Sequence, residues 1–154
     1  MAHMLGQLSP EEIEELLRSE FVGRLGCDDE GRMYIVPIAY VYDDGAIVGH
    51  STEGRKVRAM RENPNVCFEV DKIDDLSNWR SVIAWGRFEE LRGAEADRAL
   101  VHLLVRLAPR TATPASSQTP KDLTHQHRAQ VENLPTVIYR IRLLEKTGRF
   151  EKRS

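Results

Sequence analysis

Residues 46–56 read AIVGHSTEGRK and join an apolar, strand-like run to a segment with helical spacing. A strand that ends in hydroxyl groups and leads into a helix start brings unpaired backbone N–H groups, hydroxyl donors and two cations, Arg55 and Lys56, into one small volume. Such a set of donors suits a phosphate group. In the alternative interpretation Ser51 or Thr52 is only an N-cap, Glu53 complements the helix dipole, and the two cations face water. This stretch alone leaves both interpretations open.

The segments on either side predict a mainly β protein. Strand-like runs separated by turn signals occupy residues 21–27, 32–42, 46–49, 66–70, 79–91 and 136–143. Helical patterns cover residues 9–19, 53–62 and 94–107, and the first opens with a capping box formed by Ser9 and Glu12. Pro37 predicts an edge or an irregular strand position, and Gly86 predicts a bulge. We therefore expect a small β-barrel with peripheral helices. A Rossmann sheet is disfavoured because regular helices do not separate the strands and no Gly-x-Gly-x-x-Gly motif occurs.

Length and composition set broad limits on the class of protein. The chain has 154 residues, of which 41% are hydrophobic and 30% charged, with a net charge of −2. These values are typical of one soluble domain spanning residues 1–154 and give no argument for a nucleic-acid or membrane partner. We expect a cytoplasmic protein with a tag remnant and flexible start at residues 1–8 and a mobile loop at residues 108–124, which are rich in Pro, Ser and Thr.

Five stretches in order carry a resemblance to a known family. They are Gly23-Arg24-Leu25, residues 36–42, His50-Ser51 with Gly54-Arg55-Lys56, residues 63–68 and residues 79–87. Together they resemble the pyridoxamine 5′-phosphate oxidase-like FMN-binding split barrels, and most closely the branch that contains the 5-nitroimidazole resistance proteins. The resemblance covers about residues 9–92, and the last predicted strand also fits.

The resemblance implies a homodimer of six-stranded split barrels that binds FMN in two equivalent clefts at the subunit interface. Arg55 and Lys56 match the basic pair that holds the FMN phosphate, and His50 and Ser51 match the adjoining strand end. Ser81 stands where the oxidase has a glutamine near the flavin ring. The strand whose backbone runs beside the ring is matched by Val36, Pro37, Ile38 and Ala39.

The chain also departs from the oxidase. The residues that hold the substrate phosphate and the C-terminal tryptophan-and-arginine signature of that enzyme are not recognisable. This difference argues against pyridoxamine phosphate as the substrate. His125 and His127 have a spacing compatible with a metal, but no cysteine or carboxylate partner lies at ligand spacing, so we expect no metal site.

We therefore expect an FMN-dependent oxidoreductase that takes electrons from a nicotinamide and reduces a small organic acceptor of the nitro-aromatic or quinone type. Flavin hydride chemistry belongs largely to the cofactor, so no nucleophilic triad is required. His50 is the candidate catalytic group, although a polar strand cap is the alternative. Two other functions stay open. The same fold can use haem or a deazaflavin, and a dimeric module can bind a flavin or another phosphate ligand without catalysis.

Overall fold

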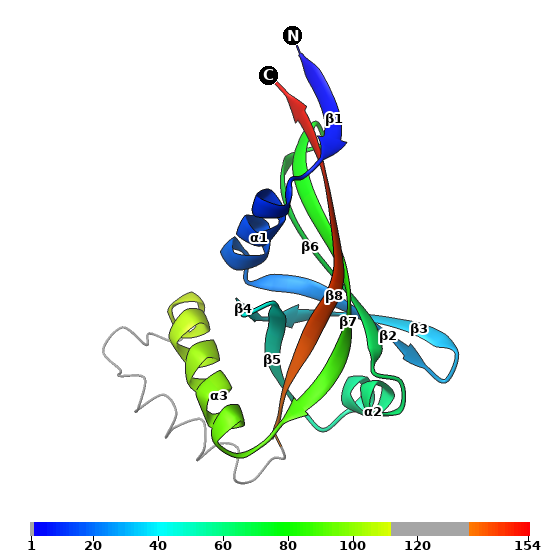
Figure 1. Ribbon diagram of the computed structural model, residues 1–154, viewed down its shortest axis with the longest axis vertical. Coiled ribbons are helices and arrows are strands. Elements are labelled where there is room, and N and C mark those ends of the chain that lie inside the picture. The colour runs from blue at the N-terminus through cyan, green and yellow to red at the C-terminus, as the bar shows by residue number, and fades with distance from the viewer. Residues whose placement is uncertain (1, 112–135) are drawn as a thin grey trace.

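A computed structural model describes residues 2–111 and 136–154 of the chain (Figure 1). These residues form eight strands, three α-helices and a short 3-10 helix. In chain order the elements are β1 (His3–Gln7), α1 (Pro10–Ser19), β2 (Val22–Asp29), β3 (Arg32–Ala39), β4 (Val41–Asp43), β5 (Ala46–Thr52), α2 (Arg55–Glu62), β6 (Asn65–Asp75), β7 (Asn78–Leu91), α3 (Gly93–Leu107), the 3-10 helix (Ala108–Arg110) and β8 (Thr136–Arg153). The predicted mainly β architecture with peripheral helices is confirmed. The expected mobile loop, after its first four residues, lies outside the described part of the chain.

The strands form an antiparallel sheet in the order β3-β2-β6-β7-β8-β5-β4, and β1 pairs with the far end of β8. Strand β8 is 18 residues long. Its first half pairs with β5 and its last residues pair with β1, so the two termini lie together at one end of the molecule (Figure 1). The first residues were expected to be a flexible start. His3–Gln7 instead form a strand, because the extended end of β8 offers them a pairing edge.

Two sequence expectations about breaks in the sheet are confirmed. Pro37 lies in β3, an edge strand of the described sheet, where its missing N–H group costs no ladder hydrogen bond. Gly86 lies at a register shift between β7 and β8, as predicted for a bulge. A Cβ atom on Gly86 would lie 2.5 Å from the carbonyl oxygen of Arg142, so only glycine fits this close approach of the two strands.

Three element boundaries differ from the expectations. The run 32–42 divides at Tyr40, whose side chain turns into the core and donates a 2.8 Å hydrogen bond to the carbonyl oxygen of Leu17. This division and β1 give more than the six expected strands. The polar stretch after Asp71, outside the predicted strand runs, extends β6 as far as Asp75 because it pairs with β7. Likewise, β5 continues through Thr52 because that residue pairs with Thr136 of β8.

The core lies on one side of β5 and a helix covers the other side. The main core contains the buried residues of α1 and α2. Val48, on the opposite face of β5 from Ile47, packs against Leu103 of α3. No helix within the described residues is long and apolar enough to span a membrane.

Strands β3, β2, β6 and β7 also expose a broad surface that no described helix covers, and we call this surface the outer face. Met33 is 81% exposed and Ile35 69% exposed, although both are large apolar residues. The residues of the outer face alternate with core residues along each strand. They are Val22, Arg24, Met33, Ile35, Pro37, Ala39, Cys67, Glu69, Asp71, Ser81, Ile83 and Trp85.

Candidate functional site

The start of α2 is held beside the hairpin formed by β2 and β3. Val57, Ala59 and Met60 are buried in the main core and fix the helix there. The Nε atom of Arg55 donates to Oδ2 of Asp29 at 2.5 Å. The Arg55 guanidinium also lies 4.8 Å from the centre of the Tyr34 ring. Arg55 is therefore anchored by an ion pair and a ring contact from the same hairpin.

The first turn of α2 suits an anion. Its N-cap is Gly54, which provides no side-chain hydrogen bond, so the alternative interpretation in which Ser51 or Thr52 caps the helix does not hold. The first turn contains no acidic residue and begins with Arg55 and Lys56. Free N–H groups and the positive end of the helix dipole would ordinarily disfavour cations at this end. An anion bound there would satisfy the donors and balance the charges.

Lys56 is the least compensated cation of this group. Its side chain is partly buried, and desolvation lowers the pKa of its ammonium group, while the charge of Cys27 has a smaller, opposing effect. Within residues 2–111 and 136–154, no carboxylate lies within ion-pair distance of Lys56. In contrast, the hydrogen bond and charge of Asp29 raise the pKa of Arg55. A partly buried positive charge without a partner is the expected state of a site that binds an anion.

The structure separates the two strand-end residues, His50 and Ser51. Gly49 faces the core, where a Cβ atom would lie 2.7 Å from the hydroxyl oxygen of Tyr139. Side chains alternate along a strand, so Ser51 is on this same face, whereas His50 is on the α3 side with Val48. Ser51 is partly buried, and its hydroxyl donates to the carbonyl oxygen of Thr52 at 2.9 Å. His50 is exposed. A catalytic role for His50 stays a prediction.

The expected ring-side residues lie on the edge strand β3. Val36 and Ile38 face the core, while Pro37 and Ala39 are exposed on the outer face. Among the described strands only β2 pairs with β3, so the other edge of β3 keeps backbone groups available for a ligand.

Ser81 lies on the same outer face but far from β3. It belongs to β7 and is opposite Asp71 of β6. Two strands, β2 and β6, separate β7 from β3, which corresponds to roughly 14 Å at the usual strand spacing. Ser81 and Ala39 of one chain therefore do not contact the same small group.

An apolar groove of about 420 Å³ is lined by residues of strands β2, β3, β6 and β7. It connects the outer face to the hairpin that holds Arg55, because Tyr34 lines the groove together with Ile35, Gly26, Cys67 and Trp85. Neither Tyr34 nor Asp29 was expected from the sequence to be a site residue. One local signal could have indicated Tyr34. It lies two residues before Val36, so strand alternation puts both residues on the same face of β3.

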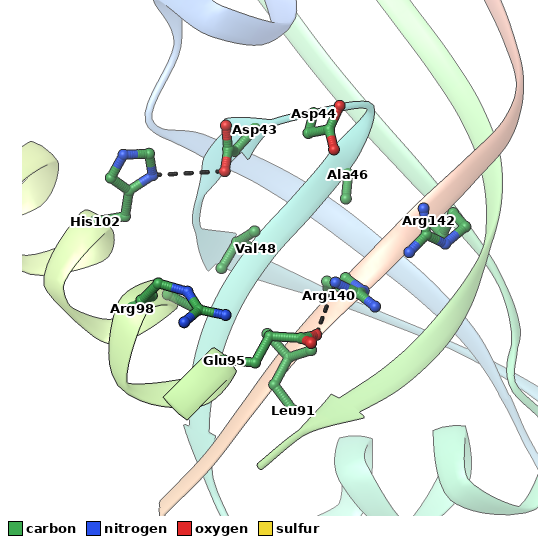
Figure 2. Close-up of a pocket in the computed structure, with 11 residues that line it drawn as sticks. Asp43, Asp44, Ala46, Val48, Leu91, Glu95, Arg98, His102, Arg140 and Arg142 are labelled. Atoms are coloured by element: carbon green, nitrogen blue, oxygen red, sulfur yellow. Dashed lines mark ion pairs between the residues drawn. The ribbon is translucent and has the colours of Figure 1, made fainter. Parts of the chain in front are cut away.

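A second cavity, of about 450 Å³, lies between α3 and strands β4, β5 and β8 (Figure 2). Several of its charged side chains pair with one another. Arg140 contacts Glu95 at 2.9 Å, and His102 lies 3.7 Å from Asp43 (Figure 2). None of the site residues expected from the sequence lines this cavity.

No group of three or more His, Cys, Asp or Glu side chains in the described part of the chain could hold a metal ion. His125 and His127 lie outside the described residues.

Comparisons with known proteins give the family. The family model for pyridoxamine 5′-phosphate oxidase matches residues 9–150. An uncharacterized protein of Rhizobium meliloti is 32% identical over 84 residues, which are 54% of this chain and 56% of that relative. The solved structure of an FAD-binding protein from Mesorhizobium loti is 29% identical, with a TM-score of 0.77 and coverage of 99% of this chain and 100% of that chain.

A candidate 5-nitroimidazole antibiotic resistance protein from Bacteroides thetaiotaomicron has a TM-score of 0.68 at 17% identity, covering 98% of this chain and 90% of that one, and so shares the fold. The predicted resemblance is confirmed by the family match and by these neighbours. The chain is a split barrel and belongs to the pyridoxamine 5′-phosphate oxidase family.

Proposed function

We propose that this chain is an FMN-binding flavoprotein of the cytoplasm. It acts as an oxidoreductase that reduces a small nitro-aromatic or quinone-type acceptor with electrons from a nicotinamide. The observation that carries the proposal is the partly buried Lys56, without a described carboxylate partner, at the uncapped start of α2. The family match and the FAD-binding relative from Mesorhizobium loti support a flavin as the ligand.

The residues near α2 fit the phosphate end of the cofactor. Lys56 and the first N–H groups of α2 would bind the phosphate. Ser51, on the core-facing side of β5, would add a hydroxyl by exchanging its bond to the Thr52 carbonyl oxygen for one to the phosphate. Arg55 would contribute the donors that its pair with Asp29 leaves available. The flavin would supply the hydride chemistry. The unpaired edge of β3, at residues 36–39, would orient the ring.

We further propose that two copies of the chain form a homodimer through the outer face. Exposed apolar side chains such as Met33, Ile35 and Trp85 make this face a suitable interface. The position of Ser81 supports shared sites, because it is too far from β3 to reach a ring bound there within its own chain. In a two-fold dimer, Ser81 of one copy would approach the ring bound by the other copy.

The test is an absorption spectrum of the purified protein, recorded alone and after addition of FMN and separation from free ligand. Oxidised flavin bands that stay with the protein support the proposal, and chromatography of the released flavin distinguishes FMN from FAD. The double variant Arg55→Ala/Lys56→Ala should fold and lose the flavin. The matched control Arg58→Ala/Lys72→Ala removes the same charge at exposed positions and should retain it. Equal flavin retention by both double variants would overturn the phosphate assignment.

The alternative of a non-catalytic flavin-binding module is favoured by one observation. His50, the candidate catalytic group, lies on the opposite face of β5 from Ser51. Bound flavin that is reduced by NADH or NADPH and reoxidised by a quinone supports the enzyme. Flavin that binds but resists reduction supports the module, and a Soret band would indicate haem instead.

A further inference from the structure

Three charged side chains form a compact cluster within the largely apolar outer face. Nη1 of Arg24, on β2, lies 3.7 Å from Oε1 of Glu69 and 3.8 Å from Oδ2 of Asp71, both on β6. Each carboxylate side chain is less than one third exposed. Glu69 and Asp71 are two residues apart on one strand, so they point to the same side of the sheet. One cation therefore faces two carboxyl groups.

The strands next to this cluster bring no further charge to it. Ile83 is opposite Glu69 on β7, Ser81 is opposite Asp71, and Pro37 is opposite Arg24 on β3. The preceding outer-face residue of β6 is Cys67. The nearest charged residue along the register row is Arg149 of β8, beyond Ser81. Helices α1 and α2 pack on the core side of these strands, and α3 packs against β4, β5 and β8, so none of the three reaches the cluster.

The cluster is neutral only when it holds one proton. With both carboxyl groups ionised, one arginine leaves a net charge of −1 in a half-buried position. Burial raises the pKa of Glu69 to about 7, and the hydrogen bond and charge of Asp71 act in the same direction, while Arg24 acts against them. Glu69 is therefore the group that takes the proton near neutral pH.

We propose that association of two copies of the chain through the outer face is linked to protonation of the Arg24–Glu69–Asp71 cluster. This inference rests on the homodimer proposed above. A two-fold interface would bring the same patch of both copies out of water. Two arginines then meet four carboxyl groups however they pair across the interface, so a neutral interface needs two protons. A second copy also suits this surface because each patch carries both signs of charge.

The consequence is a dimer that weakens as pH rises. Below about pH 7 Glu69 is already protonated in the separate subunits, so the dissociation constant is nearly independent of pH. Above that pH each association event must take up protons from solution. The dissociation constant then rises by up to about tenfold per pH unit for each proton, or about a hundredfold for two.

The test is analytical ultracentrifugation of the purified protein between pH 6 and pH 9, with the flavin spectrum recorded on the same samples. We expect the wild-type dissociation constant to rise above pH 7. The variant Glu69→Gln keeps a neutral side chain of the same shape, and its dimer should be equally tight at every pH. The control Glu15→Gln, exposed on α1, should follow the wild-type curve. If the dimer persists at nanomolar concentration, the urea unfolding free energy of the dimer replaces the dissociation constant. It should fall as pH rises over the whole range, because Glu69 is ionised in the unfolded chain already at pH 6, and Glu69→Gln should lack this contribution.

A wild-type dimer whose dissociation constant and unfolding free energy do not change between pH 6 and pH 9 would overturn the proposal. A Glu69→Gln dimer with the wild-type pH slope would also overturn it. A monomer at every pH would refute the homodimer itself. The flavin bands answer the cofactor question separately in each case, so failure of the proton linkage is distinguishable from failure of the proposed function.

Discussion

Replacement of Lys56 by methionine should weaken flavin binding without destabilising the protein. Methionine has a similar length and no charge, so it fills the same partly buried position at the start of α2. In the ligand-free protein Lys56 carries a charge whose burial is unfavourable and which no described carboxylate balances. Removing that charge should leave the free energy of unfolding unchanged or raise it by up to about 1 kcal/mol. A purely structural lysine with a partner would show a loss instead.

The effect on the cofactor should be a large loss of affinity. A charge-assisted hydrogen bond to a phosphate contributes about 1.5–3 kcal/mol. Its removal therefore weakens binding by roughly 10- to 150-fold. Arg55 and the helix N–H groups remain, so binding should be weakened and not abolished.

The pH dependence of stability gives a second signature of Lys56. Its pKa in the folded chain is lower than the ordinary value of 10.5, so the unfolded chain binds more protons as pH approaches that value. Stability of the free protein should consequently gain a contribution as pH rises toward 10.5. Lys56→Met should lack this contribution, and bound flavin should reduce it in the wild type because an anion favours the charged lysine.

The measurements are urea unfolding of the flavin-free protein and a fluorescence titration with FMN for wild type, Lys56→Met and the control Lys72→Met. Lys72 is exposed on β6, so its replacement should change neither quantity appreciably. Unchanged FMN affinity in Lys56→Met, or a loss of stability above about 1 kcal/mol, would refute the assignment of Lys56 as an anion-binding group.

Three further substitutions test the fold. Tyr139→Phe should raise the unfolding free energy by about 1 kcal/mol in urea titrations, because the buried hydroxyl has no partner among the described residues; a loss of stability would point to a hidden partner. Gly86→Ala should destabilise by more than about 2 kcal/mol, since its Cβ atom would lie 2.5 Å from the Arg142 carbonyl oxygen, and an unchanged melting temperature would contradict that close approach. Ser9→Ala should cost about 1 kcal/mol through loss of its bond to the Glu12 N–H group, and thermal unfolding measures the difference; no difference would mean that the capping box contributes nothing.

Local sequence signals predicted the parts of the fold that depend on neighbouring residues. The capping box is present, with Ser9 accepting from the Glu12 N–H group at 3.2 Å and Glu12 accepting from the Ser9 N–H group at 2.9 Å. The bulge at Gly86 and the edge position of Pro37 also follow from the chemistry of single residues.

Boundaries that depend on distant partners could not be predicted in this way. β1 exists because β8 extends far enough to pair with it, and the polar end of β6 is a strand because β7 continues beside it. Thr52 looks like a helix cap in sequence, yet pairing with Thr136 keeps it in β5 and moves the cap to Gly54. For β1 and Thr52 the deciding partner is β8, far away in sequence, whereas the polar end of β6 is held by its own hairpin with β7, in which Asp75 pairs with Asn78.

The candidate site also combines features that neighbouring residues predict with features that depend on the fold. The segment from the strand end to the helix start was evident in the sequence because its residues are contiguous. That His50 and Ser51 point to opposite faces follows from alternation once both lie in β5, but which of them is on the core side depends on the fold, and the short polar strand end does not reveal it. The cluster of Arg24 with Glu69 and Asp71 joins two strands distant in sequence, and no local pattern indicates it.

The two adjacent cations at the start of α2 look equivalent in sequence but are not equivalent in the fold. Arg55 is about half exposed, and its charge is largely balanced by Asp29, with its guanidinium set against Tyr34. Lys56 has lost part of its hydration and has no described carboxylate to replace it. A phosphate therefore gains more from Lys56, because its binding relieves an existing desolvation cost, whereas at Arg55 it must share the guanidinium with a carboxylate. The ion pair between Arg55 and Asp29 has a structural effect instead. It fixes the β2–β3 hairpin, which includes the edge strand β3, relative to the helix start that would hold the phosphate.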